Sequence, residues 1–211
     1  MSRLQEEAKQ FLVPLLLGKK SHLHRRAQRI LAAWVAMTVM VAEFLYRDRL
    51  AIPATDRQWL RENRTAPAHW RIWVGHQGRK NAPMYYKNVL TLVSEEEFKS
   101  VPHPALPEGN TQTTTISLGQ HLLIHVMSSV VGAPYIRRWN IPAELAAGLG
   151  QIWPIRNGTI RWPPRHDLTF SDRGIETLAN EFFRRVTAYS GRKLDELSLG
   201  HSIKDLPGQP N

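Results

Sequence analysis

The segment from Ile30 to Ala42 contains no charged residue, and it constrains the fold more than any other part of the chain. A stretch that is apolar on all sides is stable in water only when other elements cover it, so it predicts a buried core helix. A helix that spans a bilayer needs about 20 apolar residues, and Glu43 interrupts this run earlier. We therefore expect a cytoplasmic protein with no membrane partner.

Further helices are expected on both sides of this run. Residues 2–17 have the periodicity of a short amphipathic helix, which Gly18 ends. Ser21 is a suitable N-cap for the long second helix, predicted to run to about Arg49. A third, short helix is predicted from Thr55 to Glu62, and a last one from Arg173 to Tyr189.

The middle of the chain has the alternation typical of strands. Residues 69–74 and 84–93 are rich in β-formers, and they predict a hairpin with a long polar loop. Residues 153–162 contain Asn157-Gly158 and predict a second, small hairpin. The stretch 113–131 fits both a helix and a strand face, and its length favours a helix.

The order of these elements predicts the fold class. Helices are followed by strands and then by helices, with no repeated βαβ unit, which is typical of an α+β protein. We expect N-terminal helices that include one long buried helix, a small antiparallel sheet or hairpins, and a C-terminal helix. The 211 residues suit a single compact domain. A subdivision would fall at 94–110, an acidic linker rich in proline.

The charge of the chain favours an anionic partner. Lys and Arg number 28 against 18 Asp and Glu, a formal net charge of +10. Such a charge attracts polyanions, and Arg is well suited to phosphate because its guanidinium binds two oxygens at once. The chain has no cysteine, which excludes a disulfide scaffold, a thiolate metal site and a cysteine nucleophile. The first hypothesis is therefore a non-catalytic nucleic-acid-binding protein, with DNA and RNA both open.

Basic and aromatic residues alternate in several segments and are the candidates for contacts with nucleic acid. On a strand, Arg71 and Trp73 share one face, and an exposed sheet face of this kind can stack bases and bind phosphates. The same mixture recurs in the predicted loops. The predicted nucleic-acid-binding residues are Lys19, Lys20, Arg25, Arg26, Arg29, Arg71, Trp73, Arg79, Lys80, Tyr85, Lys87, Arg137, Arg138, Arg161 and Arg165.

Two patterns suggest an enzyme instead. His121 and His125 are four residues apart, and on a helix they would face the same way, as paired metal ligands do. The sequence offers no HExxH arrangement and no third ligand, so neither a metal nor another cofactor is assigned. The spacing Arg-x4-His at Arg64–His69 and at Arg161–His166 resembles the short signature of HEPN ribonucleases. That signature opens a helix, and Pro67, Pro163 and Pro164 depart from it here.

Two alternatives thus stand beside the first hypothesis. The chain could be a metal-dependent or HEPN-like nuclease or phosphodiesterase, with His121, His125, Arg161 and His166 as the catalytic candidates. It could also be a scaffold that binds a protein partner, because Trp and Arg are frequent anchors of protein interfaces. Each alternative predicts a different response to salt and to divalent metal ions.

Overall fold

The computed structural model describes residues 3–44, 52–78, 84–91, 111–129, 141, 143–156, 158–164, 169–190 and 201–202, and for 90–91, 129, 182–190 and 201–202 only the backbone. The helices are α1 (Arg3–Leu16), α2 (Arg25–Ala42), α3 (Ala54–Asn63), α5 (Ala143–Ala146) and α6 (Asp172–Ser190). The strands are β1 (Ser21–His24), β2 (Arg71–His76), β3 (Met84–Thr91), β4 (Thr111–Leu118), β5 (Leu122–Ser129), β6 (Leu149–Trp153), β7 (Thr159–Trp162) and β8 (His201–Ser202).

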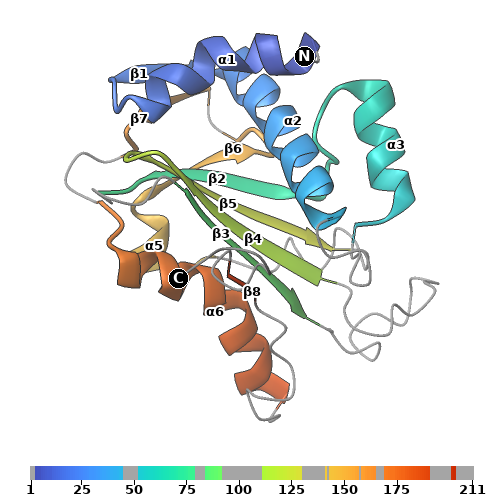
Figure 1. Cartoon of the computed structure of the whole chain (residues 1–211), viewed down its shortest axis with the longest axis vertical. Coiled ribbons are helices and arrows are strands. Elements are labelled where there is room, and N and C mark those ends of the chain that lie inside the picture. The colour runs from blue at the N-terminus through green and yellow to red at the C-terminus, as the bar shows by residue number, and fades with distance from the viewer. Residues whose placement is uncertain are drawn as a thin grey trace, which may run out of the picture.

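An antiparallel six-stranded sheet in the order β6-β2-β5-β4-β3-β8 forms the centre of the molecule. Helices α1 and α2 lie on one side of this sheet, and α5 and α6 lie on the other (Figure 1). The presence of helices together with antiparallel sheets confirms the α+β class. Among the described residues no helix is long and apolar enough to cross a membrane.

The two faces of the sheet pack against different cores. The larger core joins the buried side of α2 to alternate residues of the strands, including Ile72, Ile116 and Ile124. The smaller core lies under α6 and includes Trp73, Leu123 and Ile175. Because side chains alternate along a strand, neighbouring strand residues enter opposite cores. A strand residue that lies between two residues of the larger core, such as Trp73 between Ile72 and Val74, therefore faces the smaller core.

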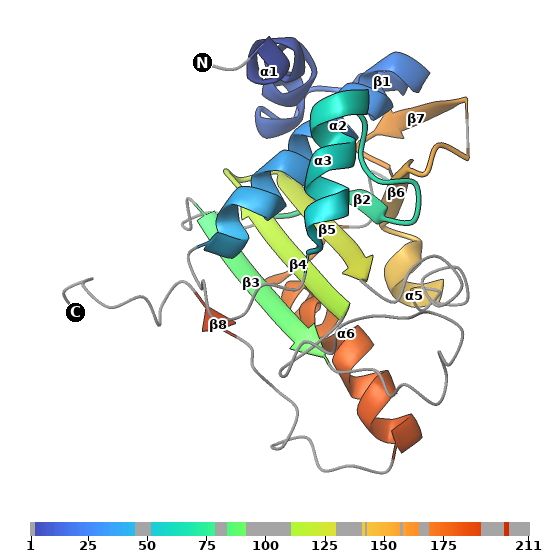
Figure 2. The same ribbon diagram turned by 90° about the vertical axis from the view of Figure 1, so that its right-hand side faces the viewer.

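A second sheet has two strands, β1 and β7, which pair antiparallel from Ser21↔Trp162 to His24↔Thr159. We call this pair the ribbon. Leu23, Ile160 and Trp162 point inward and join the larger core, and the residues between them face outward. The ribbon lies beside the beginning of α2, at one end of the molecule (Figure 2).

The expected helix at 113–131 is wrong, because this stretch forms strands β4 and β5. The two strands pair along their whole length, from Thr111↔Ser129 to Leu118↔Leu122. The β-branched side chains of the threonine run favour an extended backbone. Gly119 adopts a positive φ of 59° in the tight turn between the strands, a conformation that glycine takes without strain. The apolar stretch was long enough for a helix because it contains two strands and the turn between them.

Both predicted hairpins are also wrong, although strands form at those places. β2 pairs with β5 and β6, whereas β3 pairs with β4 and β8. The segment 153–162 contributes to two different sheets, because β6 adds to β2 and β7 pairs with β1. Alternation in sequence identifies a strand, but its partner depends on long-range packing. The proposed linker at 94–110 lies outside the described residues.

Helix α2 begins later than expected. Residues 21–24 form β1, and the N-cap is His24, whose Nδ1 accepts a hydrogen bond from the amide of Ala27 at 3.3 Å. Ser21 is therefore a strand residue and not the cap. Glu43 follows the helix and is buried, where it accepts hydrogen bonds from the amide of Ile52 and from the Arg57 side chain. This buried carboxylate ties the end of α2 to α3.

Candidate nucleic-acid interface and histidine pair

The ribbon and the elements beside it carry a group of exposed cations. Two lie in the turn that precedes β1, three in the first turns of α2, one in the segment between β6 and β7, and one on β7. All have exposed side chains, and no ion pair joins any of them to another residue in the described ranges. We call them the ribbon cations: Lys19, Lys20, Arg25, Arg26, Arg29, Arg156 and Arg161.

Local structure places these cations around the ribbon and the start of α2, elements that lie side by side at one end of the molecule (Figure 2). Arg161 lies directly across from His22 in the ribbon, and both side chains face outward. Arg25 and Arg29 are one helical turn apart, so they lie on one side of α2. Residues 17–42 and 149–164 contain no Asp or Glu. The outer side of the ribbon and the start of α2 therefore form a positive surface without an acidic residue of their own.

The electrostatics at the start of α2 are unfavourable without an anion. The first turn of a helix carries partial positive charge, and acidic residues usually stabilise it. Here that turn has no acidic residue and holds Arg25 and Arg26, with Arg29 one turn further on. Each such cation costs up to about 1 kcal/mol. An anion bound at this surface would remove that cost.

Other predicted contact residues lie inside the molecule. Arg71 is 3% exposed and Trp73 is 6% exposed, on the face of the sheet that α6 covers. Trp73 packs in the smaller core, and its ring lies 5.7 Å from that of His125. The two residues share a face, as the alternation predicts, but this face is not open to solvent in the structure.

Tyr85 and Lys87 lie on the same face and contact α6. Both donate hydrogen bonds to the carboxylate of Glu176, the Tyr85 hydroxyl at 2.6 Å. Burial acts to raise the pKa of Glu176, but the hydrogen bonds from Lys87, Tyr85 and Asn180 together hold that pKa below its ordinary value. Lys87 is therefore neutralised by a carboxylate and is not available to a phosphate in this arrangement.

Six predicted residues lie outside the described residues: Arg79, Lys80, Arg137, Arg138, Arg165 and His166. Of the fifteen residues predicted to contact nucleic acid, the structure brings together six, which belong to the turn before β1, the start of α2 and β7. Arg156 lies in the segment between β6 and β7, three residues before β7, and no sequence pattern singles it out, because only the pairing of β7 with β1 brings this segment to the ribbon.

His121 and His125 do not form a pair, because they lie on a turn and a strand and not on a helix. His125 is buried, and its Nδ1 lies 2.8 Å from the Thr115 hydroxyl. Burial lowers the pKa of His125 to about 3, so the ring is neutral at physiological pH. His125 is therefore a buried, neutral side chain beside Trp73 of the smaller core.

His121 instead pairs with His76, a residue that the sequence did not single out. His76 Nε2 lies 3.2 Å from His121 Nδ1, and the two rings are parallel within 5°. The other ring nitrogen of His76 lies 3.2 Å from the Thr169 hydroxyl. The end of β2 and the turn between β4 and β5 bring the two rings together. Only the strand pairing, with His76 opposite Leu122, could have revealed this pair.

The Arg-x4-His patterns do not open helices. Arg64 ends α3 in a left-handed conformation and contacts Glu7, whereas His69 contacts the buried Asp56 at 3.1 Å. Arg161 lies within β7 and His166 lies outside the described residues. The helical setting on which the resemblance to HEPN ribonucleases depends is absent at Arg64–His69 and at Arg161.

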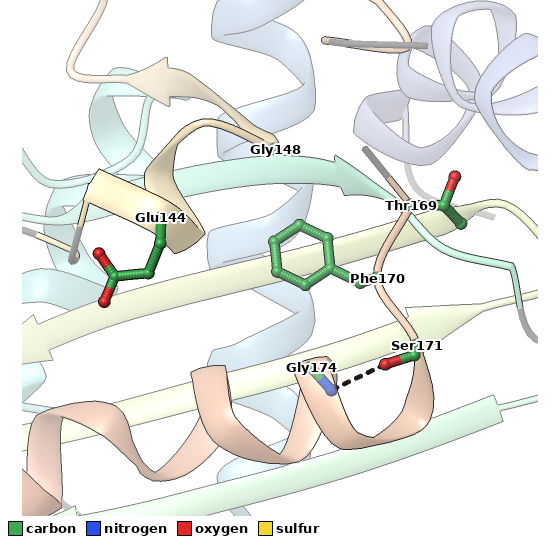
Figure 3. Close-up of a pocket in the computed structure, with 6 residues that line it drawn as sticks. All are labelled: Glu144, Gly148, Thr169, Phe170, Ser171 and Gly174. Atoms are coloured by element: carbon green, nitrogen blue, oxygen red, sulfur yellow. Dashed lines mark hydrogen bonds between the residues drawn. The ribbon is translucent and has the colours of Figure 1, made fainter. Parts of the chain in front are cut away.

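A small cavity of about 150 Å³ lies between α5 and the beginning of α6, and Glu144, Thr169, Phe170 and Ser171 line it. The ring of Phe170 occupies the space between the two helices, and the Glu144 carboxylate points away from that ring (Figure 3). The Ser171 hydroxyl accepts a hydrogen bond from the Gly174 amide and caps α6. The polar groups shown therefore do not point toward a common position in the cavity.

Within the described ranges, no group of three or more His, Asp or Glu side chains is arranged to hold a metal ion. Comparison with family models, with curated proteins and with solved structures gives no match. The surface and the side chains of the described residues are therefore the basis of the proposed function.

Proposed function

We propose that this protein binds nucleic acid without catalysis, through the phosphate backbone, at the surface formed by the ribbon cations. The observation that carries the proposal is the acid-free cluster of exposed Lys and Arg side chains in the turn before β1, at the start of α2, and on β7 and the segment that precedes it. Cations without carboxylate partners are free to replace the counterions of a polyanion, and this release drives binding.

The position of the cluster supports a phosphate ligand in particular. The cations at the start of α2 lie where the helix itself is positive, so they repel the helix end unless an anion is bound. The exposed imidazoles of His22 and His24 lie on the same outer face of the ribbon and can donate further hydrogen bonds to phosphate oxygens. Backbone contacts of this kind position a nucleic acid but read no sequence.

The stacking contribution predicted from the sequence has less support. Trp73 is buried, Tyr85 bonds to Glu176, and Trp162 on the ribbon points into the larger core. Residues 19–29 and 158–162 expose no Phe, Tyr or Trp side chain. The proposal therefore rests on phosphate contacts, with affinity expected to depend strongly on salt.

The test is fluorescence-anisotropy binding to labelled DNA and RNA at low salt. The variant R25Q/R26Q/R29Q removes three ribbon cations, and its matched control K9Q/R61Q/R173Q removes three exposed cations from α1, α3 and α6. Both variants have the same net charge. We expect at least tenfold weaker binding for the first variant and nearly unchanged binding for the control. Equal losses in the two would show attraction by net charge alone.

The same samples separate the alternatives. The ligand is recovered after binding, with and without Mg²⁺ or Mn²⁺, and examined on a denaturing gel. Intact ligand supports the non-catalytic proposal, whereas cleaved ligand would favour a nuclease. If the unaltered protein does not bind any of the ligands even at low salt, the proposal is wrong and a protein partner becomes the better hypothesis.

A further inference from the structure

The pairing of His76 with His121 has no role in the proposed phosphate surface. Both residues are half-buried, so solvent reaches the pair. A neutral imidazole has one donor and one acceptor nitrogen. His76 Nε2 and His121 Nδ1 are close enough that one of two arrangements must hold. Either one nitrogen carries a proton and donates it to the lone pair of the other, or a cation lies between two lone pairs.

We propose that His76 and His121 form a binding site for a divalent transition-metal ion, with Zn²⁺ as the best match. Zinc binds histidine nitrogen at 2.0–2.1 Å, and tetrahedral geometry then places two such nitrogens about 3.3 Å apart. The observed separation of 3.2 Å fits this span without movement of the backbone. Imidazole nitrogen is also a favoured ligand for zinc.

The second nitrogen of His76 has the environment of a metal ligand. Its Nδ1 lies 3.2 Å from the Thr169 hydroxyl oxygen, which can accept the Nδ1 proton and leave the lone pair on Nε2. Metal-binding histidines usually donate this second N–H to an oxygen, which fixes the tautomer and the orientation of the ring. Thr169 is thus a positioning residue for His76.

The backbone around both rings is fixed before any ion binds. The Phe170 amide donates to the His76 carbonyl at 2.8 Å, and the Gln77 amide donates to the His121 carbonyl at 2.9 Å. The Gln77 side chain donates to the Gly119 carbonyl in the same turn at 2.9 Å. Gly18 at the end of α1 packs so closely on the His121 ring that an added Cβ would lie 2.9 Å from it. These contacts supply the preorganisation that a metal site needs.

Water completes the coordination in this proposal. The described part of the chain provides no third His, Asp or Glu ligand at this place. Two imidazoles and two waters give a four-coordinate ion that can exchange with solvent. No net proton is released when both rings are neutral, because His121 only moves its proton from Nδ1 to Nε2.

The test is a Zn²⁺ titration of the full chain, monitored by competition with a chromophoric chelator and by the thermal unfolding temperature. We expect one equivalent of Zn²⁺ to bind and to raise the unfolding temperature, because the ion binds only the folded state. H121Q should lower the Zn²⁺ affinity at least tenfold and abolish the thermal shift. The control H22A removes an exposed histidine of the ribbon and should leave both unchanged.

A measurement on the unaltered protein keeps the proposal testable if H121Q does not fold. Zn²⁺ should shift the NMR signals of His76 Nε2 and His121 Nδ1 before those of other imidazoles. Shifts at His22 and His24 with none at His76 would overturn the proposal. Equal Zn²⁺ affinity of the unaltered protein and H121Q, or no binding of Zn²⁺ at all, would also overturn it, and would leave the pair as a hydrogen bond only.

Discussion

Lys87, Thr115, His125 and Trp73 form a row across four neighbouring strands, on the face that α6 covers. The row mixes a cation, a hydroxyl, an imidazole and an indole in a place that is closed to solvent for three of its four members. Buried polar groups are costly unless they are hydrogen-bonded, and the Thr115 hydroxyl meets this need for His125. His125 is therefore a sensitive point for the stability of this layer.

We expect the free energy of unfolding to decrease as the pH falls below about 6.5. Burial lowers the pKa of His125 to about 3 in the folded state, whereas the unfolded chain binds the proton near pH 6.5. Between these values the unfolded state binds more protons, so acid favours unfolding by up to about 1.4 kcal/mol per pH unit. Urea unfolding at several pH values measures this slope.

The variant H125Q serves as the control for that slope, because its side chain does not titrate. Its unfolding free energy should depend less on pH between 6.5 and 4 than that of the unaltered protein. An identical pH dependence in the two proteins would show that His125 is accessible to protons in the folded state.

At this scale the sequence predicts which residues share a face, but not what covers the face. The alternation in 69–74 correctly places Arg71 and Trp73 together. Their burial depends on the layer that includes α6, whose Ile175 and Leu178 share the smaller core with Trp73 from about a hundred residues further along the chain. The alternation of residues along a strand contains no information about which distant helix covers the strand. The face of Arg71 and Trp73 was therefore predicted to be exposed, whereas it is buried.

Some helices and strands can be predicted from the local sequence pattern, whereas others form only through packing with distant parts of the chain. Residues 30–42 form a helix, as their composition predicts. Residues 21–24 become a strand only because 159–162 lie beside them, and a ribbon of four residues per strand is not stable without such packing. Six of the seven ribbon cations were predicted from charge and from the basic-aromatic pattern, and Arg156 was not, but their proximity depends on this pairing.

Glu43 joins two of these elements, and we expect Glu43→Ala to lower the free energy of unfolding by about 2–3 kcal/mol. The substitution removes the acceptor for the Ile52 amide and the ion pair with Arg57. Arg57 keeps its hydrogen bond to the Met40 carbonyl and its contact with the Phe44 ring, so the loss is partial.

Chemical denaturation measures the effect, and Glu62→Ala on the exposed side of α3 is the matched control. The control should change stability by less than about 0.5 kcal/mol. A loss for Glu43→Ala as small as that of the control would mean that the buried carboxylate does not stabilise the junction of α2 and α3.

Over the whole molecule, the charge is unevenly placed. The ribbon end has only cations in residues 17–42 and 149–164, whereas described cations elsewhere, such as Arg3, Arg57 and Lys87, contact carboxylates. A net charge of +10 attracts a polyanion from a distance, and a surface without carboxylates decides where it binds. The net charge follows from the composition, but only the fold brings together the cations that form no ion pair.

We expect the protein to prefer a duplex to a single strand of the same length. A duplex presents phosphates at a higher density, and the described ribbon surface exposes no Phe, Tyr or Trp ring for stacking bases. Competition between unlabelled duplex and single-stranded DNA against one labelled ligand measures the preference. Tighter binding of the single strand would indicate that stacking residues outside the described ranges take part.

The most direct test of the proposed function is the salt dependence of duplex DNA binding, measured for the unaltered protein and for R25Q/R26Q/R29Q. The logarithm of the affinity falls with the logarithm of the salt concentration by about 0.9 for each phosphate contact. Three lost contacts should therefore make the slope shallower by about 2–3, while K9Q/R61Q/R173Q keeps the original slope. An unchanged slope in the ribbon variant would contradict the claim that Arg25, Arg26 and Arg29 contact phosphates.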